Sequence, residues 1–393
     1  MRSREFFKPN LVIVAGDSKE DSLTKNVISR LPNATIEYVD DFKSIGELEK
    51  NIFTKYLSTK YQASYDDIPT DIKFSEGKRV LILTRHKGNW IKSCPGTSSH
   101  VCCNLFTVDP GEGCPLDCTY CYLQSYLKAN PTLKLYSNTS DLLHELSEKF
   151  TSEPGRLFRV GTGELIDSLV WDDLTDFSKE IVPFFAKFPN AVLELKSKDD
   201  YVANLVDLKD EHNGKTVVSW SINAPSVSGK DEKSTASVDE RIAAAKKVVE
   251  AGYRVGFHFD PLVYFEGWEE EYSELIERVF SQISPENVAW VSISSLRYQG
   301  NLQEMMMKRF PDSLLPYGEQ FMAKDSKLRY IQPIRFKLVR FVWNKLKEVS
   351  DTLPVYMCME SSAAWKEIAG GSPVAGDEIK EIFSRRVILP VLN

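Results

Sequence analysis

Three of the chain's seven cysteines lie within eight residues, in the segment GCPLDCTYCYLQSYL (113–127). Cys114, Cys118 and Cys121 have the spacing C-x3-C-x2-C. A zinc ribbon usually offers two CxxC pairs and a thioredoxin-type site offers two thiols, so neither matches three. Thiolates are soft ligands that suit iron–sulfur clusters, and three of them on a four-iron cluster leave one iron open to a small molecule. The spacing therefore predicts a cluster with an open position, with a structural metal site as the alternative.

Short apolar segments rich in β-branched residues recur along the chain and predict the strands that position these cysteines. Helical patterns separate them, at 141–149, 172–187, 237–251 and 268–283. Such a series of β–α units predicts a parallel sheet with right-handed crossovers, open or curled toward a barrel. The predicted strands are 105–109, 156–161, 191–197, 216–223, 254–261 and 287–294.

Polar and reactive residues follow the predicted strands. In a parallel β/α barrel the carboxyl ends of the strands form the face on which active sites are built. Loops are commonly polar, but the recurrence of reactive residue types favours one site at this face. After the three cysteines, the candidates in chain order are Gly163, Glu164, Lys198, Ser221, Asn223, His258, Asp260, Ser294, Ser295 and Arg297.

With 393 residues the chain is longer than one compact core usually grows. We predict an N-terminal α/β domain over 1–103, a core over 104–300 and a C-terminal extension over 301–393. The first strand of the N-terminal domain is not followed by a Gly-rich phosphate-binding motif, so we expect a structural role for that domain. The extension carries a basic amphipathic stretch at 329–349, which we interpret as a helix docked on the core, with a contact for phosphates as the alternative.

The composition, 42% hydrophobic and 27% charged, is that of an ordinary globular protein. No apolar run approaches the length of a membrane span, and the first residues lack the apolar core of a signal peptide. We therefore expect a cytoplasmic protein without a membrane partner, in which clustered cysteines bind metal or do chemistry. The net charge of −7 argues against a surface that coats nucleic acid but allows a local basic patch.

A C-x3-C-x2-C motif after the first strand of a six-unit β/α series resembles the signature of the radical S-adenosylmethionine (SAM) enzymes. The resemblance implies a partial (β/α)6 barrel of the TIM type, with a [4Fe-4S] cluster on the three cysteines and SAM on the open iron. An electron from a reductant such as flavodoxin or ferredoxin would then cleave SAM to a 5′-deoxyadenosyl radical that abstracts a hydrogen atom. The segment RVGTGE (159–164) looks like the family's glycine–glutamate element, in which Gly163 permits close approach and Glu164 binds the SAM amino group.

Within this superfamily the chain resembles spore photoproduct lyase, which repairs a methylene-linked thymine dimer in DNA by radical cleavage of the linking bond. The resemblance implies that Lys198, Ser221 and Asn223 contact SAM. It also places Tyr120 and Tyr122 beside the cluster as relays of a hydrogen atom, with aromatic packing as the alternative. The likeness is thin beyond residue 300. It rests on CTYCYLQ (118–124), HNGKTVVSWSIN (212–223), ERIAAAKKVVEAGYRVGF (240–257) and YFEGWEEEY (264–272).

One position departs from the lyase pattern, which carries a hydrogen-donating cysteine after its second strand. Here Thr162 occupies that place, and its O–H bond is too strong to replace a thiol. We therefore expect the donor among the other cysteines, with Cys358 as our candidate and a second iron–sulfur cluster as a further hypothesis. Buried thiols that act as small hydrophobes are the alternative. These cysteines are Cys94, Cys102, Cys103 and Cys358.

Asp260 also departs from the lyase pattern, which is apolar there, and we predict that it binds the ribose of SAM or a substrate group. A satisfied structural pair of His258 and Asp260 is the alternative. Arg297 is a candidate for the SAM carboxylate or a substrate anion. The leading hypothesis is thus a radical SAM lyase in DNA repair. A radical SAM enzyme acting on a small molecule or peptide is the first alternative. A non-catalytic nucleic-acid-binding or iron-sensing module is the second, although a sensor would not need the predicted SAM pocket.

Overall fold

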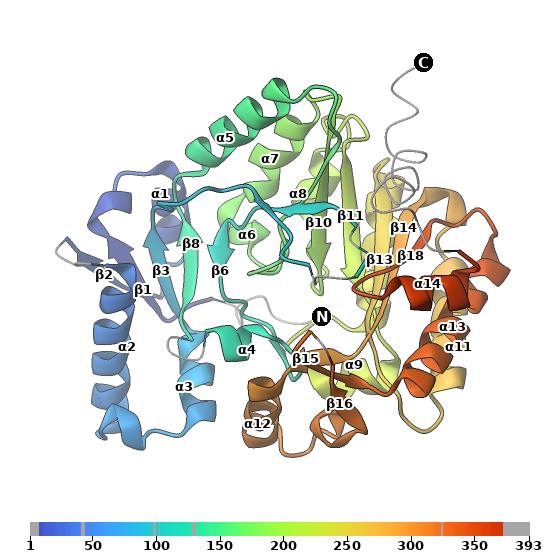
Figure 1. Ribbon diagram of the computed structural model, residues 1–393. Coiled ribbons are helices and arrows are strands. Elements are labelled where there is room, and N and C mark those ends of the chain that lie inside the picture. The colour runs from blue at the N-terminus through green and yellow to red at the C-terminus, as the bar shows by residue number, and fades with distance from the viewer. Residues whose placement is uncertain are drawn as a thin grey trace.

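A computed structural model describes residues 8–40, 44–96, 100–101, 103–127, 131–323 and 325–371. Figure 1 shows a smaller N-terminal sheet beside a larger sheet that curls around the middle of the molecule, with helices on the outside. The described helices are each too short or too polar to cross a membrane.

The N-terminal sheet has the strand order β2-β1-β3-β8-β6. Its first three strands alternate with helices as expected, and β1 and β3 are fully buried because both faces of the sheet are covered. Strands β6 and β8 come from beyond residue 103, so the sheet extends past the predicted domain boundary, and the domain division stays a prediction. The elements are β1 (Leu11–Ala15), α1 (Ser22–Ser29), β2 (Thr35–Val39), α2 (Ile45–Tyr61), α3 (Thr70–Gly77), β3 (Val80–Thr84), β6 (Gly111–Glu112) and β8 (Leu133–Tyr136).

The larger sheet has the order β18-β14-β13-β11-β10-β9-β5-β4, and neighbouring strands from β18 to β5 are parallel. This confirms the predicted α/β class and the six predicted strands. Strand β18 (Val355–Met357) was not predicted, because three apolar residues give no periodic signal. The other strands are β4 (Lys92–Ser93), β5 (Leu105–Thr107), β9 (Phe158–Gly161), β10 (Ala191–Ser197), β11 (Thr216–Ser221), β13 (Arg254–Leu262) and β14 (Val288–Ser295).

The crossover helices follow the sequence pattern with one correction. The helix expected over 172–187 is broken into α6 (Asp172–Thr175) and α7 (Phe177–Phe185) by Asp176, which has a φ of 53°. The carboxylate of Asp176 forms an ion pair with Arg30 of the N-terminal part, a long-range contact that helix propensity does not reveal. Other helices between these strands are α5 (Thr139–Ser152), α8 (Ala203–Asp207), α9 (Pro225–Asp231), α10 (Val238–Glu250) and α11 (Trp268–Phe280).

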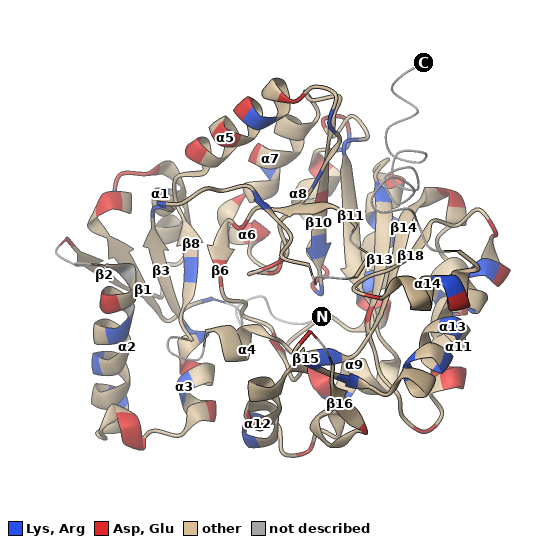
Figure 2. Ribbon diagram, viewed as in Figure 1, with Lys and Arg blue, Asp and Glu red and all other residues tan. Residues whose placement is uncertain are grey.

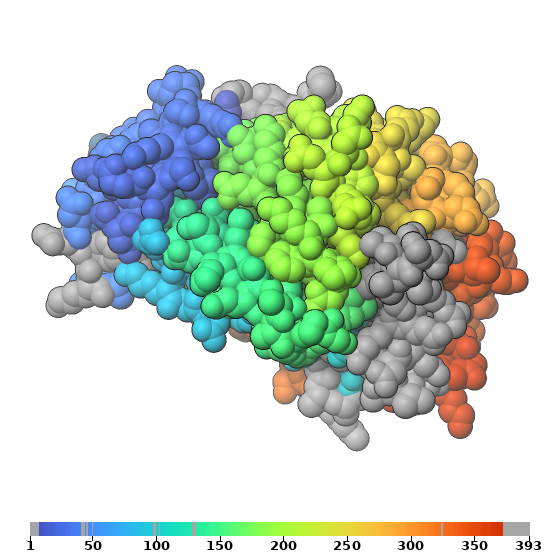
Figure 3. Space-filling view, turned by 90° about the horizontal axis from the view of Figure 1, so that it is seen from above, coloured from blue at the N-terminus to red at the C-terminus, as the bar shows by residue number. Residues whose placement is uncertain are grey.

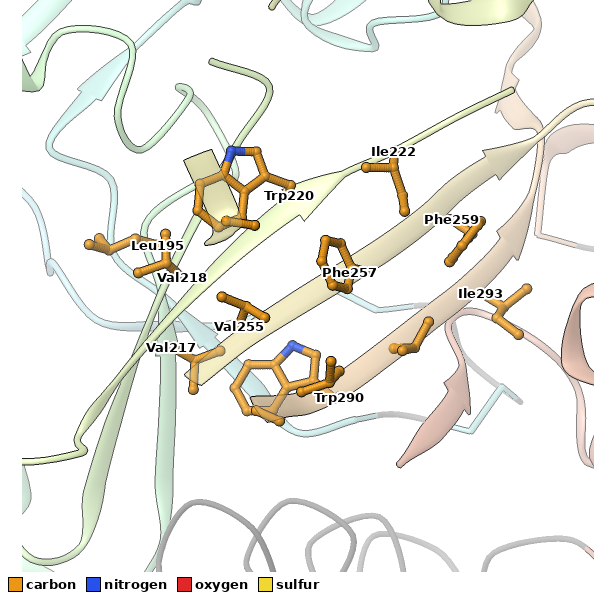
Figure 4. Packing of buried hydrophobic residues seen from close by; sticks show 14 of the residues in the cluster. Leu195, Val217, Val218, Trp220, Ile222, Val255, Phe257, Phe259, Trp290 and Ile293 are labelled. Carbon is orange, nitrogen blue, oxygen red and sulfur yellow. The ribbon is translucent and has the colours of Figure 1, made fainter. Parts of the chain in front are cut away.

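Apolar side chains fill the space between the strands and these helices. Figure 4 shows Trp220, Phe257 and Trp290 among aliphatic side chains of the neighbouring strands β11, β13 and β14. Charged residues of both signs are interspersed along the outer helices, while the strands carry few (Figure 2). Seen from above in Figure 3, the N-terminal segment (blue) lies directly against the segment that follows β9 (green). Arg30 contributes to this junction by donating to the carbonyl oxygens of Asp173 and Leu174.

The C-terminal part includes the predicted basic helix and a small antiparallel sheet. Helix α13 (Gln332–Val349) packs on α11 and β14, and its cations form ion pairs, Lys337 with Glu269 at 2.9 Å and Arg340 with Glu367 at 2.6 Å. These pairs support the docked-helix interpretation over a contact for phosphates. The other elements are β15 (Arg297–Gln299), α12 (Gly300–Arg309), β16 (Gln320–Met322), β17 (Lys327–Tyr330) and α14 (Ser362–Ala369).

The interior of the curled sheet contains a buried polar network centred on Glu194. Its carboxylate accepts hydrogen bonds from His258 Nε2 at 2.7 Å, Ser219 Oγ at 2.8 Å and Trp290 Nε1 at 3.0 Å. Arg159 Nη2 donates to the other oxygen at 2.7 Å. Burial alone would raise the pKa of Glu194, but the charges of Arg159 and His258 hold it well below its usual value. Glu194 is therefore ionised and fully satisfied near neutral pH.

We expect Glu194→Ala to destabilise the protein by about 3–5 kcal/mol, because it leaves the Arg159 guanidinium without its buried counter-charge. Because the folded-state pKa is depressed, the contribution of Glu194 is present above its unfolded value, near 4.5, and is lost as the pH falls below it. Urea unfolding of both proteins between pH 4 and pH 7 measures the difference. The matched control, Glu37→Ala on exposed β2, should change stability by no more than about 0.5 kcal/mol. Equal stabilities of wild type and Glu194→Ala would contradict the assignment.

Candidate active site at the carboxyl end of the sheet

The cysteine loop leaves β5 and is fixed to the core by contacts on both sides. Strand β7 (Asp117–Cys118) pairs antiparallel with β12 (Glu232–Lys233), and Thr119 N donates to Asp231 O at 2.8 Å. On the side of the N-terminal sheet, Lys78 Nζ donates to Cys114 O at 2.9 Å. The loop ends in α4 (Leu123–Tyr126), which packs beside α12 (Figure 1). The loop is thus held between two parts of the fold.

The three thiols lie near one another, and burial sets their properties. Burial raises the pKa of Cys114 to about 12 and the pKa values of Cys118 and Cys121 above the usual range, and the charge of Cys121 adds to the increase at the other two. They are therefore neutral unless a metal holds them as thiolates. Among the described residues, no group of three or more His, Cys, Asp or Glu is placed to hold a single metal ion. Thiolates are soft donors, which suit an iron–sulfur cluster.

The loop after β9, which carries Gly163 and Glu164, is tied to the cysteine loop. Tyr122 Oη donates to Glu164 O at 2.8 Å, and Gly113 N donates to Leu165 O at 2.9 Å. A Cβ at Gly163 would lie 3.1 Å from Lys196 O, so packing against β10 by itself favours glycine there. The structure brings Glu164 and Tyr122 together beside the cysteines, whereas the predicted contact of Glu164 with an amine stays a prediction.

Asp109, two residues after the end of β5, also holds the loop that carries Glu164. Its carboxylate accepts from Leu165 N at 2.9 Å. Burial, followed by the nearby charge of Glu164, raises the pKa of Asp109 to about 6. The Glu164 loop is thus held by three hydrogen bonds that the sequence did not reveal.

Tyr120 points to a buried cluster of charges. Its hydroxyl donates to Glu232, which also pairs with Arg241 Nη2 at 2.6 Å and lies 3.9 Å from Lys198 Nζ. The ammonium of Lys198 lies 5.5 Å from the centre of the Tyr120 ring. Burial would raise the pKa of Glu232, but Arg241 and Lys198 lower it to about 2, so the carboxylate is ionised. The structure therefore places Lys198 and Tyr120 at the cysteine loop, as expected.

Ser221 is the last residue of β11 and Asn223 follows it, but the side chain of Asn223 already has hydrogen-bond partners within the protein. Its Oδ1 accepts from Tyr272 Oη at 2.7 Å, and its Nδ2 donates to Pro261 O at 2.9 Å. Ser221 is buried, and its carbonyl oxygen accepts from Arg241 Nη1 at 2.8 Å. Asn223 thus has a clear structural role, and contact of either residue with SAM stays a prediction.

Asp260 and Arg297 form one ion pair at the same end of the sheet. Arg297 Nη1 lies 3.1 Å from Asp260 Oδ1, and Arg297 Nη2 lies 3.3 Å from Oδ2. The guanidinium also donates from Nε to Met359 Sδ at 3.0 Å. Burial would raise the pKa of Asp260, but Arg297 lowers it, so both groups are charged. The two predicted residues meet each other, and each satisfies much of the other's charge.

Cys358 follows β18 and lies beside this pair. Burial raises its pKa to about 12, with the charge of Cys103 adding to the increase and that of Arg297 opposing it. An antiparallel bridge joins His100 to Ser361, and Val101 N donates to Glu360 O at 3.1 Å. The charge of Cys103 acts on the pKa of Cys358, so these two thiols lie close to each other.

The other predicted positions are kept apart from this group. Thr162 is fully buried, and its hydroxyl donates to Ser168 Oγ at 2.8 Å, so it cannot reach a substrate without breaking that bond. Cys94 follows β4, where its backbone N donates to Leu105 O at 2.8 Å. Cys102 lies outside the described residues. A second cluster therefore stays a hypothesis, supported here only by the closeness of Cys103 and Cys358.

Comparison with known proteins decides the family. A family model for spore photoproduct lyase matches residues 69–357. The chain belongs to the spore photoproduct lyase family. The lyase of Bacillus subtilis (strain 168) is 30% identical over 246 residues, which cover 62% of this chain and 69% of that protein. The lyase of Geobacillus sp. (strain Y412MC61) is 27% identical over 256 residues, which cover 64% of this chain and 72% of that protein.

Solved structures of spore photoproduct lyase share the fold. One, complexed with dinucleoside spore photoproduct, has a TM-score of 0.74 at 22% identity and covers 89% of this chain and 99% of that chain. Another, a variant with bound AdoMet and dinucleoside spore photoproduct, has a TM-score of 0.73 at 21% identity. This match covers 90% of this chain and 99% of that chain. The likeness shows that this spore photoproduct lyase family member has the radical SAM fold that the cysteine motif indicated.

Several residues of the site were missed by the sequence analysis. Glu232 and Arg241 meet the cysteine loop although they lie more than a hundred residues after it. Arg241 stands in a segment that resembles the lyase, but nothing in that segment points to the cysteine loop. Asp109 is the last residue of a predicted strand, and that position was the one signal that could have found it. Strand β18 brings Tyr356 into the interior, where its hydroxyl accepts from Arg159 Nη2 at 3.0 Å.

We expect Asp109→Asn to stabilise this spore photoproduct lyase family member at pH 7.5 by at most about 3 kcal/mol and to leave its stability unchanged near pH 4. The amide can still accept from Leu165 N, and it removes a buried charge. The folded-state pKa of Asp109 is raised to about 6, so the wild type loses stability as the pH rises from about 4 through 6. Thermal unfolding at both pH values, with exposed Asp210→Asn as the matched control, measures the effect. A pH-independent difference between Asp109→Asn and wild type would rule this explanation out.

Proposed function

We propose that this chain is a radical SAM lyase that cleaves the methylene-linked thymine lesion in DNA. The observation that carries the proposal is a loop of three thiols, Cys118 buried and Cys114 and Cys121 partly buried, at the carboxyl end of the parallel sheet, where this fold builds its sites. Family membership and relatives named spore photoproduct lyase support the reaction. Solved relatives that contain AdoMet and dinucleoside spore photoproduct support the cosubstrate and the lesion.

We propose Cys114, Cys118 and Cys121 as the ligands of a [4Fe-4S] cluster. With SAM on its open iron, such a cluster supplies a 5′-deoxyadenosyl radical when it receives one electron. Glu164 then offers a carboxylate to the amino group of SAM, on a loop that Tyr122 and Asp109 keep in place. Lys198, only 15% exposed in its side chain, offers an ammonium to the carboxylate of SAM on the other side of the cysteine loop.

Arg297 and Asp260 are proposed to face the substrate or the ribose of SAM. Their ion pair keeps both charged groups in fixed positions at the mouth of the barrel, and either can exchange one contact for a ligand contact. A flavodoxin or ferredoxin is the proposed electron donor, by resemblance to the superfamily.

Cys358 is the proposed hydrogen-atom donor. Cleavage of a carbon–carbon bond by a radical leaves a carbon radical, and a thiol S–H bond is weak enough to quench it. Tyr356 points into the barrel, and side chains two residues apart on a strand share a face, so Cys358 also faces the interior. Thr162 is bonded internally and cannot take this role.

A small molecule or peptide as substrate is the second candidate. It is favoured by the replacement of the expected cysteine by Thr162 and by the net charge of −7. Phosphate contacts weaken as salt rises, so binding to lesion-containing duplex DNA over a salt series distinguishes the two substrates. Absence of salt-dependent DNA binding would favour the second candidate.

The decisive test is anaerobic reconstitution with iron and sulfide, followed by incubation with SAM, dithionite and dinucleoside spore photoproduct. We expect about four irons per chain, formation of 5′-deoxyadenosine and conversion of the photoproduct to two thymidines. The triple variant Cys114→Ala, Cys118→Ala, Cys121→Ala should lack both iron and product. Formation of 5′-deoxyadenosine without any repair would retain the radical SAM assignment and reject the lesion.

For the donor, we expect Cys358→Ser to lower the yield of repaired dinucleotide by at least about tenfold while 5′-deoxyadenosine is still formed. Serine has the size of cysteine but lacks the weak S–H bond, so the substrate radical goes to other products. Product analysis by mass spectrometry measures the ratio of repair to 5′-deoxyadenosine. Cys94→Ser, a thiol after β4, is the matched control. An unchanged ratio in Cys358→Ser would exclude Cys358 as the donor.

A further inference from the structure

Glu232 is a buried carboxylate placed directly against the cysteine loop. In the antiparallel pairing of β12 with β7, Glu232 is the partner of Cys118. Its side chain is 1% exposed, and it accepts hydrogen bonds from Tyr120 Oη and from Ser228 Oγ, the latter at 3.2 Å. Glu232 contacts Cys118 through the backbone pairing of β12 with β7. Its position does not indicate that it binds SAM or substrate.

The charge around Glu232 does not sum to zero. Arg241, whose side chain is fully buried, pairs with one carboxylate oxygen at 2.6 Å, and Lys198 lies 3.9 Å from the other. Two cations against one anion give the group of Glu232, Arg241 and Lys198 one net positive charge. Asp167 and Asp117 are anions that act on Cys114 and Cys121 from other sides. Asp117 is itself shared by two cations, Lys78 at 3.3 Å and Arg309 at 3.0 Å.

Charges in a buried setting act strongly on a neighbouring redox centre, because the low local dielectric screens them poorly. Adding one electron to a cluster adds one negative charge, which nearby cations favour and nearby anions oppose. The reduction potential of an iron–sulfur cluster is accordingly set by net charge, hydrogen bonds and solvent exposure around it. Glu232 contributes a negative charge at the ligand loop itself.

We infer that Glu232 is a positioning residue that sets the reduction potential of the cluster on Cys114, Cys118 and Cys121. It opposes reduction by its own charge, and it holds Arg241 and Lys198, which favour reduction, in fixed places. The inference rests on the proposed function, since it requires a cluster on these cysteines. It adds a residue that acts through the cluster and not on SAM or the lesion.

The test is a potentiometric titration of the reconstituted full chain without SAM, followed by electron paramagnetic resonance of the reduced cluster. Glu232→Gln removes the charge and keeps the size and one acceptor oxygen. At a fixed solution potential we expect the ratio of reduced to oxidised cluster to rise about tenfold, which equals a shift of about 59 mV to more positive potential. Lys198→Met removes a cation from the same group, and we expect a shift of similar size in the opposite direction.

Two controls separate charge from structure. Tyr120→Phe removes the hydrogen bond to Glu232 without a change of charge and should shift the ratio much less than Glu232→Gln. Glu277→Gln removes an exposed carboxylate on α11, far from the loop in sequence, and should not shift it. If Glu232→Gln fails to fold, the Lys198→Met titration decides alone.

The outcomes distinguish this inference from the proposed function. A wild-type chain that binds no cluster defeats the proposed function before any titration. A wild-type chain with a cluster, together with Glu232→Gln and Lys198→Met variants that hold equal iron and titrate at the wild-type potential, overturns the inference and leaves the proposed function standing.

Discussion

The curled sheet depends on one buried carboxylate. Glu194 on β10 accepts from side chains on β9, β11, β13 and β14, and Arg159 extends the network to Tyr356 on β18. A single acceptor that satisfies several donors fixes the strands relative to one another, and burial makes any unsatisfied member costly. These hydrogen bonds make the interior of the sheet rigid. The residues at the carboxyl ends of the strands are positioned by this rigid interior.

The candidate site lies at the carboxyl ends of these strands. Its loops are joined to one another by strand pairing, hydrogen bonds and an ion pair. The cysteine loop pairs with β12, the Glu164 loop is held by Asp109 and Tyr122, and Lys198 faces Glu232. Loops usually move more than the elements that they connect. These hydrogen bonds reduce that freedom where a radical must be generated close to its target, since misplacement of a reactive group costs rate steeply. Such fixed positions suit a reaction in which a radical must react with one particular atom of its target.

The sequence revealed the local features of this site and missed the long-range ones. The cysteine spacing predicted the loop, and the period of apolar residues predicted the six strands, because each signal depends only on residues close together in the sequence. The break at Asp176 was missed because its ion pair with Arg30 joins distant segments, and β18 was missed because three residues show no period. The charges of Glu232 and Arg241 were missed for the same reason, since only folding brings them to the cysteines. A residue such as Glu232, which acts on the cysteine loop through neighbouring side chains, has no sequence motif that would identify it.

The geometry of the barrel also explains how a donor can change its position in the chain. Strands β9 and β18 are far apart in the sheet order, yet the contact of Arg159 with Tyr356 shows that they face each other across the interior. A group at the end of one strand therefore reaches the same enclosed space as a group at the end of the other. Thr162 follows β9 and is locked by Ser168, whereas Cys358 follows β18 beside Arg297. The proposed donor, Cys358, therefore enters this space from the side opposite to Thr162.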